Sequence, residues 1–433
     1  MNPERKRIIH RPDPYIWGSY IALLIVSVIE LFSASSQEVR VGHIYDPIMR
    51  HAIFLGIGLV LMLALERMHF VWLYRLIPIF VGLSIVTMII VLFKGTNVNG
   101  AARAITIGGF MILPAEFLKL AVALGIAWIL SRTQIKNVDG SHGVSNFGIG
   151  ASAVLVVISS LLLFSQGLTN TLLLMTISLG MMLVGGIGWK KFFKVLAIYM
   201  ILGALGIGVK HITGKSESVT AEDVELARIN QTEVVGTGGR HNRVHTWEAR
   251  MKRHFRLNKT GDEIDDENKQ EQLSFIAQAR GGLTGVGIGN SRENSRLPLA
   301  FSDYIFAIIV EELGAIAAIF VMIFYLFLLG RAGRLAMQFQ STLPTLLVIG
   351  CALVICFQAL FHICIVTGVF PVSGQPLPLI SKGGTSIIAT SLALGVMLSA
   401  SRWAARKSDD EEARKHELST LPEEVAANNP SQI

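Results

Sequence analysis

FSDYIFAIIVEELG, residues 301–314, decides the fold, because it begins a long apolar run that also carries three carboxylates. Asp303 precedes the run, and Glu311 and Glu312 lie inside it. A carboxylate in or beside hydrocarbon is costly unless it has a partner or a chemical task. We therefore interpret the stretch as the start of a membrane helix in which each carboxylate has a structural or chemical role.

The composition extends this interpretation to the whole chain. Of the 433 residues, 52% are hydrophobic and 16% are charged, and the mean hydropathy is +0.53. A soluble globular protein of this length is far less apolar, so we predict an all-α polytopic membrane protein. The net charge of +7 comes from basic residues between apolar runs, as membrane insertion requires, and we expect no nucleic-acid partner.

The apolar runs predict about ten transmembrane helices, since a bilayer core needs roughly 20 apolar residues per helix. The fifth and sixth runs are separated only by SQGLTN, residues 165–170, and the pair can also be read as one broken helix. The predicted spans are 14–35, 50–66, 70–93, 112–131, 147–165, 170–188, 192–211, 303–329, 342–366 and 384–403.

Lysine and arginine in the short connections set the orientation. They are concentrated before the first span, after the last span and in alternate connections, so the positive-inside rule places both termini in the cytoplasm. We divide the chain into an N-terminal tail, 1–13, a transmembrane domain, 14–403, and a C-terminal tail, 404–433. A large extracytoplasmic loop, 212–302, connects the seventh and eighth spans, and its glycine-rich second half is expected to pack on the membrane domain.

A polar group is expected at the start of the fourth span, in GAARAITIGGFMILPAEFLKL, residues 100–120. Pro114 suits the first turn of a helix, and Glu116 then lies near the positive end of the helix dipole. Lys119 follows three residues later, so the two side chains share a face and can form an ion pair. The pair is either part of a site or an interfacial anchor of the helix end.

A second informative segment is TGVFPVSGQPLPLISKGGTS, residues 367–386. It contains three prolines and is expected to be irregular. Irregular backbone near a membrane persists only where protein buries it or where it lines a cavity. Ser381, Lys382, Thr385 and Ser386 precede or begin the last span. They can hold an anion such as a pyrophosphate at the helix N-terminus, or they can simply cap the helix.

Taken in order, these segments resemble the SEDS family (shape, elongation, division and sporulation), which includes FtsW, RodA and SpoVE. The resemblance rests on NGAARAITIGGFMILPAEFLKL (99–120), GGLTGVGIGNS (281–291) with LPLAFSDYIFAIIVEELG (297–314), and residues 367–386. It covers nearly all of 14–403 and is closer to FtsW, the division member, than to RodA. It implies the fold of that family and the activity of an integral-membrane peptidoglycan glycosyltransferase.

The resemblance also implies roles for particular residues. Asp303 matches the essential acidic residue of the outer loop, and the positions that match substrate-side motifs are Arg103, Glu116, Lys119, Gln358, Ser381, Gly383 and Gly384, with Lys382 between them. Two departures stand out. Ala104 replaces a common tryptophan, and QGLTNT around Gly167 replaces a motif with an aspartate, so stacking at 104 and an acid near 167 are not assumed.

The implied reaction joins a glycan from a lipid-pyrophosphate donor to a sugar hydroxyl of lipid II. Such a reaction needs a base for the hydroxyl and positive charge for the departing pyrophosphate. Asp303 is the expected base, and Lys119, Arg103, the amides around Gly383 and Gly384, or a divalent Mg²⁺ or Mn²⁺ ion would stabilise the leaving group. The residues are preferred because the sequence contains no dedicated oxygen-ligand loop, so no metal site is predicted.

The expected partners are lipid II, a class B penicillin-binding protein transpeptidase and other divisome proteins, at the septum of a bacterial inner membrane. A lipid II flippase, a scaffold for the transpeptidase and an elongation-type, RodA-like polymerase are the alternatives. Within the eighth span, Glu311 and Glu312 are expected about 12 Å deeper than Asp303, at roughly 1.5 Å per helical residue. We expect both to pair with polar groups of neighbouring spans, and Asp303 alone to reach the outer surface.

Overall fold

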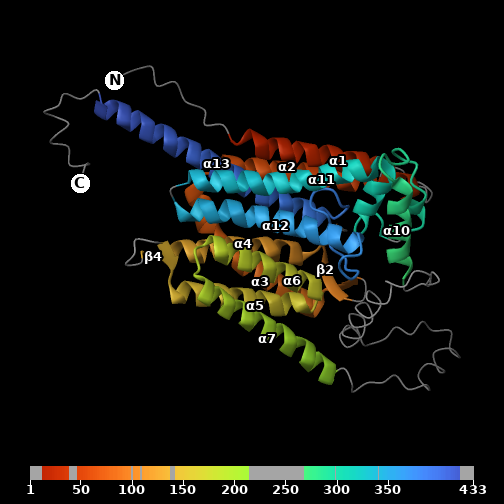
Figure 1. Ribbon diagram of the computed structural model, residues 1–433, viewed down its shortest axis with the longest axis horizontal. Helices are drawn as coiled ribbons and strands as arrows, with labels where there is room; N and C mark the ends of the chain where they lie inside the picture. The colour runs from red at the N-terminus through yellow and green to blue at the C-terminus, as the bar shows by residue number, and fades with distance from the viewer. Residues whose placement is uncertain are drawn as a thin grey trace.

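The computed structural model describes residues 12–38, 46–98, 101–107, 110–136, 142–213, 268–297, 299–339 and 341–419. Most of the loop 212–302 and parts of both tails therefore lie outside the described residues. Figure 1 shows a bundle of long helices with α10 (Lys269–Gly281) at one end, which we call the loop end. The long helices are α1 Pro14–Glu38, α2 Asp46–Arg67, α3 Phe70–Lys94, α4 Pro114–Arg132, α5 Asn146–Phe164, α6 Leu168–Val184, α7 Trp189–Thr213, α11 Ile305–Gln338, α12 Thr342–Val366 and α13 Gly384–Ser419.

Each predicted span coincides with one of these helices, and the all-α polytopic membrane fold is confirmed. Eight of them are long and apolar enough to cross a membrane. The helix α6 has 17 residues, at the short limit of about 17 for a spanning helix, and the side chains of α7 are described only in its first half. The chain turns between α5 and α6 at Gly167, and the two helices pack against each other, so they are not one broken helix.

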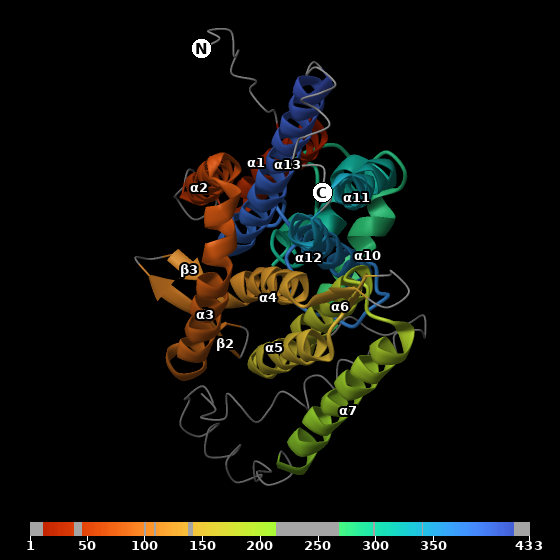
Figure 2. The ribbon, with the colours of Figure 1, turned by 90° about the vertical axis from the view of Figure 1, so that its left-hand side faces the viewer.

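The helices differ in how far protein covers them. In α4, α12 and α13, 78%, 72% and 83% of the apolar window is buried, against 17% in α2 and 22% in α3. Helices that are apolar all round belong either in a protein interior or in lipid. The helices α4, α12 and α13 therefore form the interior of the bundle, and α2 and α3 present most of their apolar surface to lipid. Figure 2 shows α7 set apart from the other helices, packed mainly on α6.

Two short sheets connect helices and were not predicted from the sequence. A three-stranded antiparallel sheet, β1 Thr96–Val98, β2 Ala101–Ile107 and β3 Phe110–Ile112, lies between α3 and α4. A hairpin of β4 Gln134–Lys136 and β5 His142–Val144 joins α4 to α5. The strands are too short to give a clear two-residue periodicity beside long apolar helices. A further difference is that α13 continues as a helix to Ser419, into the segment assigned to the C-terminal tail.

The helix α11 is broken at Gly314, which has φ 85° and ψ 168°. The glycine-rich segment after α10 supplies main-chain hydrogen bonds at the break. The amides of Val286 and Gly287 donate to the carbonyls of Glu311 and Glu312, and Ala315 N donates to Gly282 O, at 2.9 to 3.0 Å. Main-chain groups freed at the break are therefore bonded by the loop, as backbone at membrane depth requires. The expectation that this part of the loop packs on the membrane domain is correct.

The remainder of α11 runs antiparallel to α1. Arg331 Nε donates to Asp13 Oδ2 at 2.9 Å at the far end of the bundle, and Ser33 Oγ donates to Glu312 Oε1 near the loop end. The first part of α11, residues 305–313, runs in the opposite direction to the remainder. Two contacts show this: Glu312 bonds to Ser33 near the loop end, whereas Ile305 lines a hollow together with Ser27, farther from that end. The distance along α1 from Ser27 to Ser33 is about 9 Å at roughly 1.5 Å per residue.

This reversal corrects the expected depths of the carboxylates. Glu312 lies level with Ser33, whereas Ile305, which follows Asp303 closely, lies level with a part of α1 farther from the loop end. Glu311 and Glu312 are therefore not deeper than Asp303. The prediction assumed one straight helix through Gly314, and the break in that helix is the reason it is wrong.

The conformation of Gly314 generates a testable expectation. Gly314→Ala should lower the free energy of unfolding by about 1–3 kcal/mol, because φ and ψ there suit only glycine and its Cβ would collide with the backbone of Leu283 and Gly285. The measurement is thermal unfolding of the purified protein in detergent. Gly330→Ala, in the same helix and with open space around its Cβ, is the matched control. Equal stability of the two variants would contradict the role assigned to the break.

Candidate functional site

Asp303 is held where the end of the loop 212–302 meets the segment before α13. Ser302 Oγ donates to Asp303 Oδ1 at 2.9 Å, and Asp303 N donates to Leu299 O at 3.0 Å. Ser381 Oγ donates to Ser302 O at 2.8 Å, and Lys382 N donates to Phe301 O at 2.9 Å. These bonds join residues 299–303 to residues 381–382, two segments that the sequence separates by about 80 positions.

A strained residue lies at the start of the first segment and just before the second. Leu299 and Leu379 are the non-glycine residues with positive φ in the described parts of the chain, at 58° and 66°. A left-handed conformation at a leucine costs of order 1–3 kcal/mol and persists only where the surroundings impose it. Such strain is typical of functional sites, and here it lies on both sides of the contact that holds Asp303.

Gly374 covers the carboxylate of Asp303 from the same irregular segment. A Cβ atom placed on Gly374 would lie 2.8 Å from Asp303 Oδ2, closer than real Cβ contacts come. A side chain at this position would therefore have to displace the Asp303 carboxylate. Asp303 itself is partly exposed, so the segment covers it without burying it completely.

Glu116, Lys119 and Gln358 form a buried cluster. Lys119 Nζ donates to Glu116 Oε1 at 2.8 Å and to Gln358 Oε1 at 3.0 Å, and Gln358 Nε2 donates to Glu116 Oε2 at 2.9 Å. The predicted ion pair is present, and Lys119 is 0% exposed. It is therefore not an interfacial anchor of the helix end. A buried pair is favourable only when further hydrogen bonds satisfy both partners, and Gln358 of α12 supplies them.

Gln358 also connects this cluster to the segment that covers Asp303. Its Nε2 lies 3.2 Å from Pro376 O and 3.4 Å from Ser386 Oγ. Asp303 and the cluster thus contact the same stretch, 374–386, from two sides. The structure brings together Asp303, Glu116, Lys119, Gln358 and Ser381 through this stretch.

The hydroxyl groups before and at the start of α13 are used inside the protein. Ser381 Oγ accepts from Leu377 N at 2.7 Å while it donates to Ser302 O. Thr385 Oγ1 accepts from Leu113 N at 3.1 Å, which ties α13 to the start of α4. They hold the backbone in place in the structure, and the anion-binding role expected of them stays a prediction.

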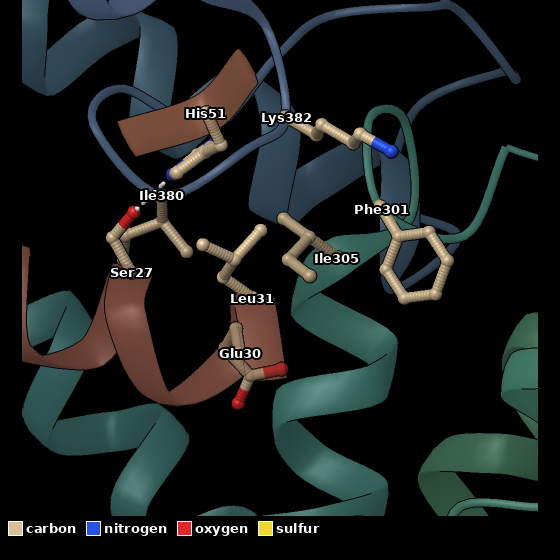
Figure 3. A pocket seen from close by; sticks show the side chains of 8 residues that line it. All are labelled: Ser27, Glu30, Leu31, His51, Phe301, Ile305, Ile380 and Lys382. Atoms are coloured by element: carbon tan, nitrogen blue, oxygen red, sulfur yellow. Dashed lines mark hydrogen bonds between the residues drawn. The ribbon is translucent and has the colours of Figure 1, made fainter. Parts of the chain in front are cut away.

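The remaining predicted residues are placed as follows. Gly384 packs on the ring of Phe54 of α2, and a Cβ on Gly383 would meet only ordinary contacts. Lys382 lines the hollow shown in Figure 3, with its side chain directed away from His51. Arg103 lies in β2, and its side chain is outside the described residues. Ala104 beside it is completely buried.

Several buried polar residues were missed by the sequence interpretation. Glu30, Ser27 and His51 line the hollow beside Phe301 and Ile305, and Ser27 Oγ lies 2.9 Å from His51 Nε2 (Figure 3). A glutamate in the middle of the first apolar run was the available signal for Glu30.

A second missed group extends the network on α12. His362 Nδ1 lies 2.6 Å from Gln375 O, and Gln375 Nε2 donates to Asn170 Oδ1 at 3.1 Å. These contacts fix the position of Gln375, and with it that of the adjoining Gly374. His362 lies one helical turn after Gln358, a spacing that places both on one face, and this was the signal in the sequence.

Glu311 and Glu312 have different partners. Glu311 accepts from Arg280 Nη1 of α10 at 2.8 Å and from Arg292 N at 3.1 Å. Its partners thus come from the loop 212–302 and not from a neighbouring span, contrary to expectation. Glu312 accepts from Ser33 of α1, a neighbouring span, as expected.

The residues around Asp303 do not make a metal cage. Across the described ranges, no group of three or more His, Cys, Asp or Glu side chains is arranged to hold an ion. The carboxylate nearest in the network, Glu116, is already bonded to Lys119 and Gln358. We therefore assign no step at Asp303 to a bound metal.

Comparison with known proteins places the chain in a family. The family model for FtsW, RodA and SpoVE, described as a cell cycle protein, matches residues 15–406. The chain belongs to this family. Among curated relatives, it is 26% identical to the probable peptidoglycan glycosyltransferase FtsW of Halomonas elongata over 90% of each chain. It is 27% identical to the stage V sporulation protein E of Bacillus subtilis, over 91% of this chain and 98% of the relative.

Solved structures show the same fold. One comes from work on the structural coordination of polymerization and crosslinking by a peptidoglycan synthase complex. It aligns with a TM-score of 0.64 at 21% identity, over 91% of this chain and 98% of that one. The RodA rod shape determining protein of Thermus thermophilus aligns with a TM-score of 0.58 at 22% identity, over 90% and 97%.

The buried ion pair gives the second prediction. Glu116→Ala should lower the free energy of unfolding by about 3–5 kcal/mol, because it leaves the Lys119 ammonium buried without its counter-ion. Thermal unfolding in detergent measures the loss. The exchanged pair Glu116→Lys with Lys119→Glu should recover part of it. Wild-type stability in Glu116→Ala would show that the pair is not needed.

Proposed function

We propose that the chain is a peptidoglycan glycosyltransferase that polymerises lipid II into glycan strands. The observation that carries the proposal is the carboxylate of Asp303, held between two strained segments and covered by Gly374. Curated relatives that match most of the chain are named peptidoglycan glycosyltransferases. A positioned carboxylate beside an irregular, partly exposed segment is what such an enzyme needs for its acceptor hydroxyl.

In the proposed mechanism, Asp303 accepts the proton of the attacking sugar hydroxyl as the oxygen bonds to the anomeric carbon of the donor. The bond from that carbon to the lipid pyrophosphate breaks, and the pyrophosphate leaves with the electron pair. Ser302, which donates to Oδ1, orients the carboxylate. Orientation matters because a near-attack geometry contributes a large part of the rate when the base is weak.

Positive charge for the leaving pyrophosphate is assigned to Lys382 and Arg103. Lys382 is bonded through its backbone to Phe301, close to Asp303 in the chain, and it is partly exposed. Lys119 is less suited, because Glu116 already balances its charge and both of its described acceptors are buried. The cluster of Glu116, Lys119 and Gln358 instead holds the 374–386 stretch in place.

The proposed setting is division. The family includes FtsW and SpoVE, and many relatives carry the name FtsW. A solved structure of the same fold belongs to a peptidoglycan synthase complex with polymerization and crosslinking. The proposed partner is a class B penicillin-binding protein, and the proposed location is the bacterial inner membrane at the septum. The distribution of lysine and arginine supports cytoplasmic termini.

The third prediction tests the base. Asp303→Asn keeps the shape of the side chain, so it should fold and bind the transpeptidase but lose lipid II polymerisation. Chain growth by the purified complex in detergent is the readout, with thermal unfolding and co-purification of the partner as folding controls. Near-normal polymerisation would remove Asp303 as the base. Transfer of lipid II across vesicles without polymerisation by the wild type would favour a flippase.

The fourth prediction tests the cover over the carboxylate. Gly374→Ala should lower kcat by about 10- to 100-fold with a small change in KM, because its Cβ displaces the carboxylate from its position. The Cβ of Gly150→Ala meets nothing within 4 Å, and this variant should retain activity. If Gly374→Ala were as active as Gly150→Ala, the approach of residue 374 to Asp303 would have no catalytic role.

A further inference from the structure

A group of buried oxygen atoms at the loop end of α1 lacks hydrogen-bond partners. Both carboxylate oxygens of Glu30 are unpartnered, although the residue is only 1% exposed. Glu312 Oε2 and Asn294 Oδ1 are also buried and unpartnered. Buried polar atoms are rarely left in this condition, so three such residues in one region require an explanation.

The three residues converge on Ser33. Glu30 lies one helical turn before Ser33 on the same face of α1. Ser33 Oγ donates to Glu312 Oε1, and Asn294 Nδ2 donates to Ser33 O at 3.3 Å. The carboxylates of Glu30 and Glu312 are close enough to repel each other. Three separate elements, α1, the turn containing Asn294 and α11, thus direct acceptor atoms to one place.

Every unpartnered atom in this group is an acceptor. Several donors nearby serve other groups: Arg280 and Arg292 N bond to Glu311, and Ser291 Oγ donates to Glu311 while accepting from Asn294 N. The amides of Gly289 and Ser291 face the Glu312 carboxylate, whose Oε2 remains unpartnered. Two carboxylates without a cationic partner among the described side chains, and an amide oxygen without a donor, are unfavourable in a dry interior.

Lys382 does not act as the counter-ion of Glu30. Both residues line the hollow in Figure 3, but the Glu30 carboxylate points away from Lys382 and from His51. The positive charge that this group requires is therefore not supplied by the cationic side chains seen beside it.

We propose that Glu30, Glu312 and Asn294 form a binding site for a divalent cation of the Mg²⁺ or Ca²⁺ class. Carboxylate and amide oxygens are the ligands these hard cations prefer, and no His or Cys that would favour zinc is among them. One divalent ion neutralises the two carboxylates and occupies all the unpartnered oxygens. With only two carboxylates the site needs the amide oxygen, and water completes the coordination.

The site has a structural consequence for Asp303. It links α1 to Ile305–Leu313, the first part of α11, which begins directly after the segment that carries Asp303. A bound cation would fix this short helix against α1 near the break at Gly314. The proposal is independent of the reaction assigned to Asp303, since it concerns stability and binding.

The test uses the full chain, purified in detergent and treated with EDTA. Adding Ca²⁺ or Mg²⁺ at a concentration about 100 times the Kd should raise Tm by a few degrees, and Na⁺ at equal ionic strength should not. Equilibrium dialysis should find one tightly bound divalent ion per chain. Glu30→Gln and Glu312→Gln should abolish both effects.

One control variant and one further measurement complete the test. Glu66→Gln replaces another buried glutamate with an unpartnered oxygen, near the end of α2, and it should retain the cation-dependent rise in Tm. Without divalent ions, Glu30→Gln should be at least as stable as the wild type, because the repulsion with Glu312 is removed. Failure of divalent ions to bind or to stabilise the wild type would overturn the proposal and indicate a proton shared by the carboxylates.

Discussion

The break of α11 at Gly314 is the constraint on which the position of Asp303 depends. Helical hydrogen bonds end there, and the glycine-rich segment after α10 supplies replacements to both sides of the break. Without those bonds, main-chain groups would be unsatisfied at membrane depth, at several kcal/mol each. With them, the chain reverses, and Ile305–Leu313 carries its N-terminal end back to the segment before α13. The glycine-rich segment after α10 is therefore part of the site.

Each buried carboxylate in the bundle needs a positive partner, and three groups of carboxylates show how this need is met. Glu116 is balanced by Lys119, and Glu311 is balanced by Arg280. Glu30 and Glu312 face each other with no such cation among the described side chains, which is why an external ion is inferred there. Removing one member of a buried pair is far more costly than removing an exposed ion pair. Charge balance thus separates the paired carboxylates, which support the fold, from Glu30 and Glu312, for which we propose a bound cation.

Local spacing in the sequence was sufficient for the helices and for the Glu116–Lys119 pair. The first depends on about 20 apolar residues in a row, and the second on two side chains three residues apart on one helix. Contacts between distant segments were beyond such reasoning. Ser33 meets Glu312 across 279 positions, and Ser381 meets Ser302 across 79. The depth of the carboxylates was wrong for the same reason, because the break at Gly314 follows from contacts with the loop and not from the local apolar pattern.

The site divides its charged groups between rigid support and chemistry. Lys119 donates to two buried acceptors, and Gln358 bonds to Glu116 and to the 374–386 stretch, so this cluster can move only if several hydrogen bonds break together. Asp303 and Lys382 differ from it, because both are partly exposed. A base and a cation for a developing charge must change partners during a reaction, whereas a support must not. The burial of Lys119 therefore supports the proposal that its charge holds the backbone around Asp303 and that the positive charge for a leaving group comes from elsewhere in the site.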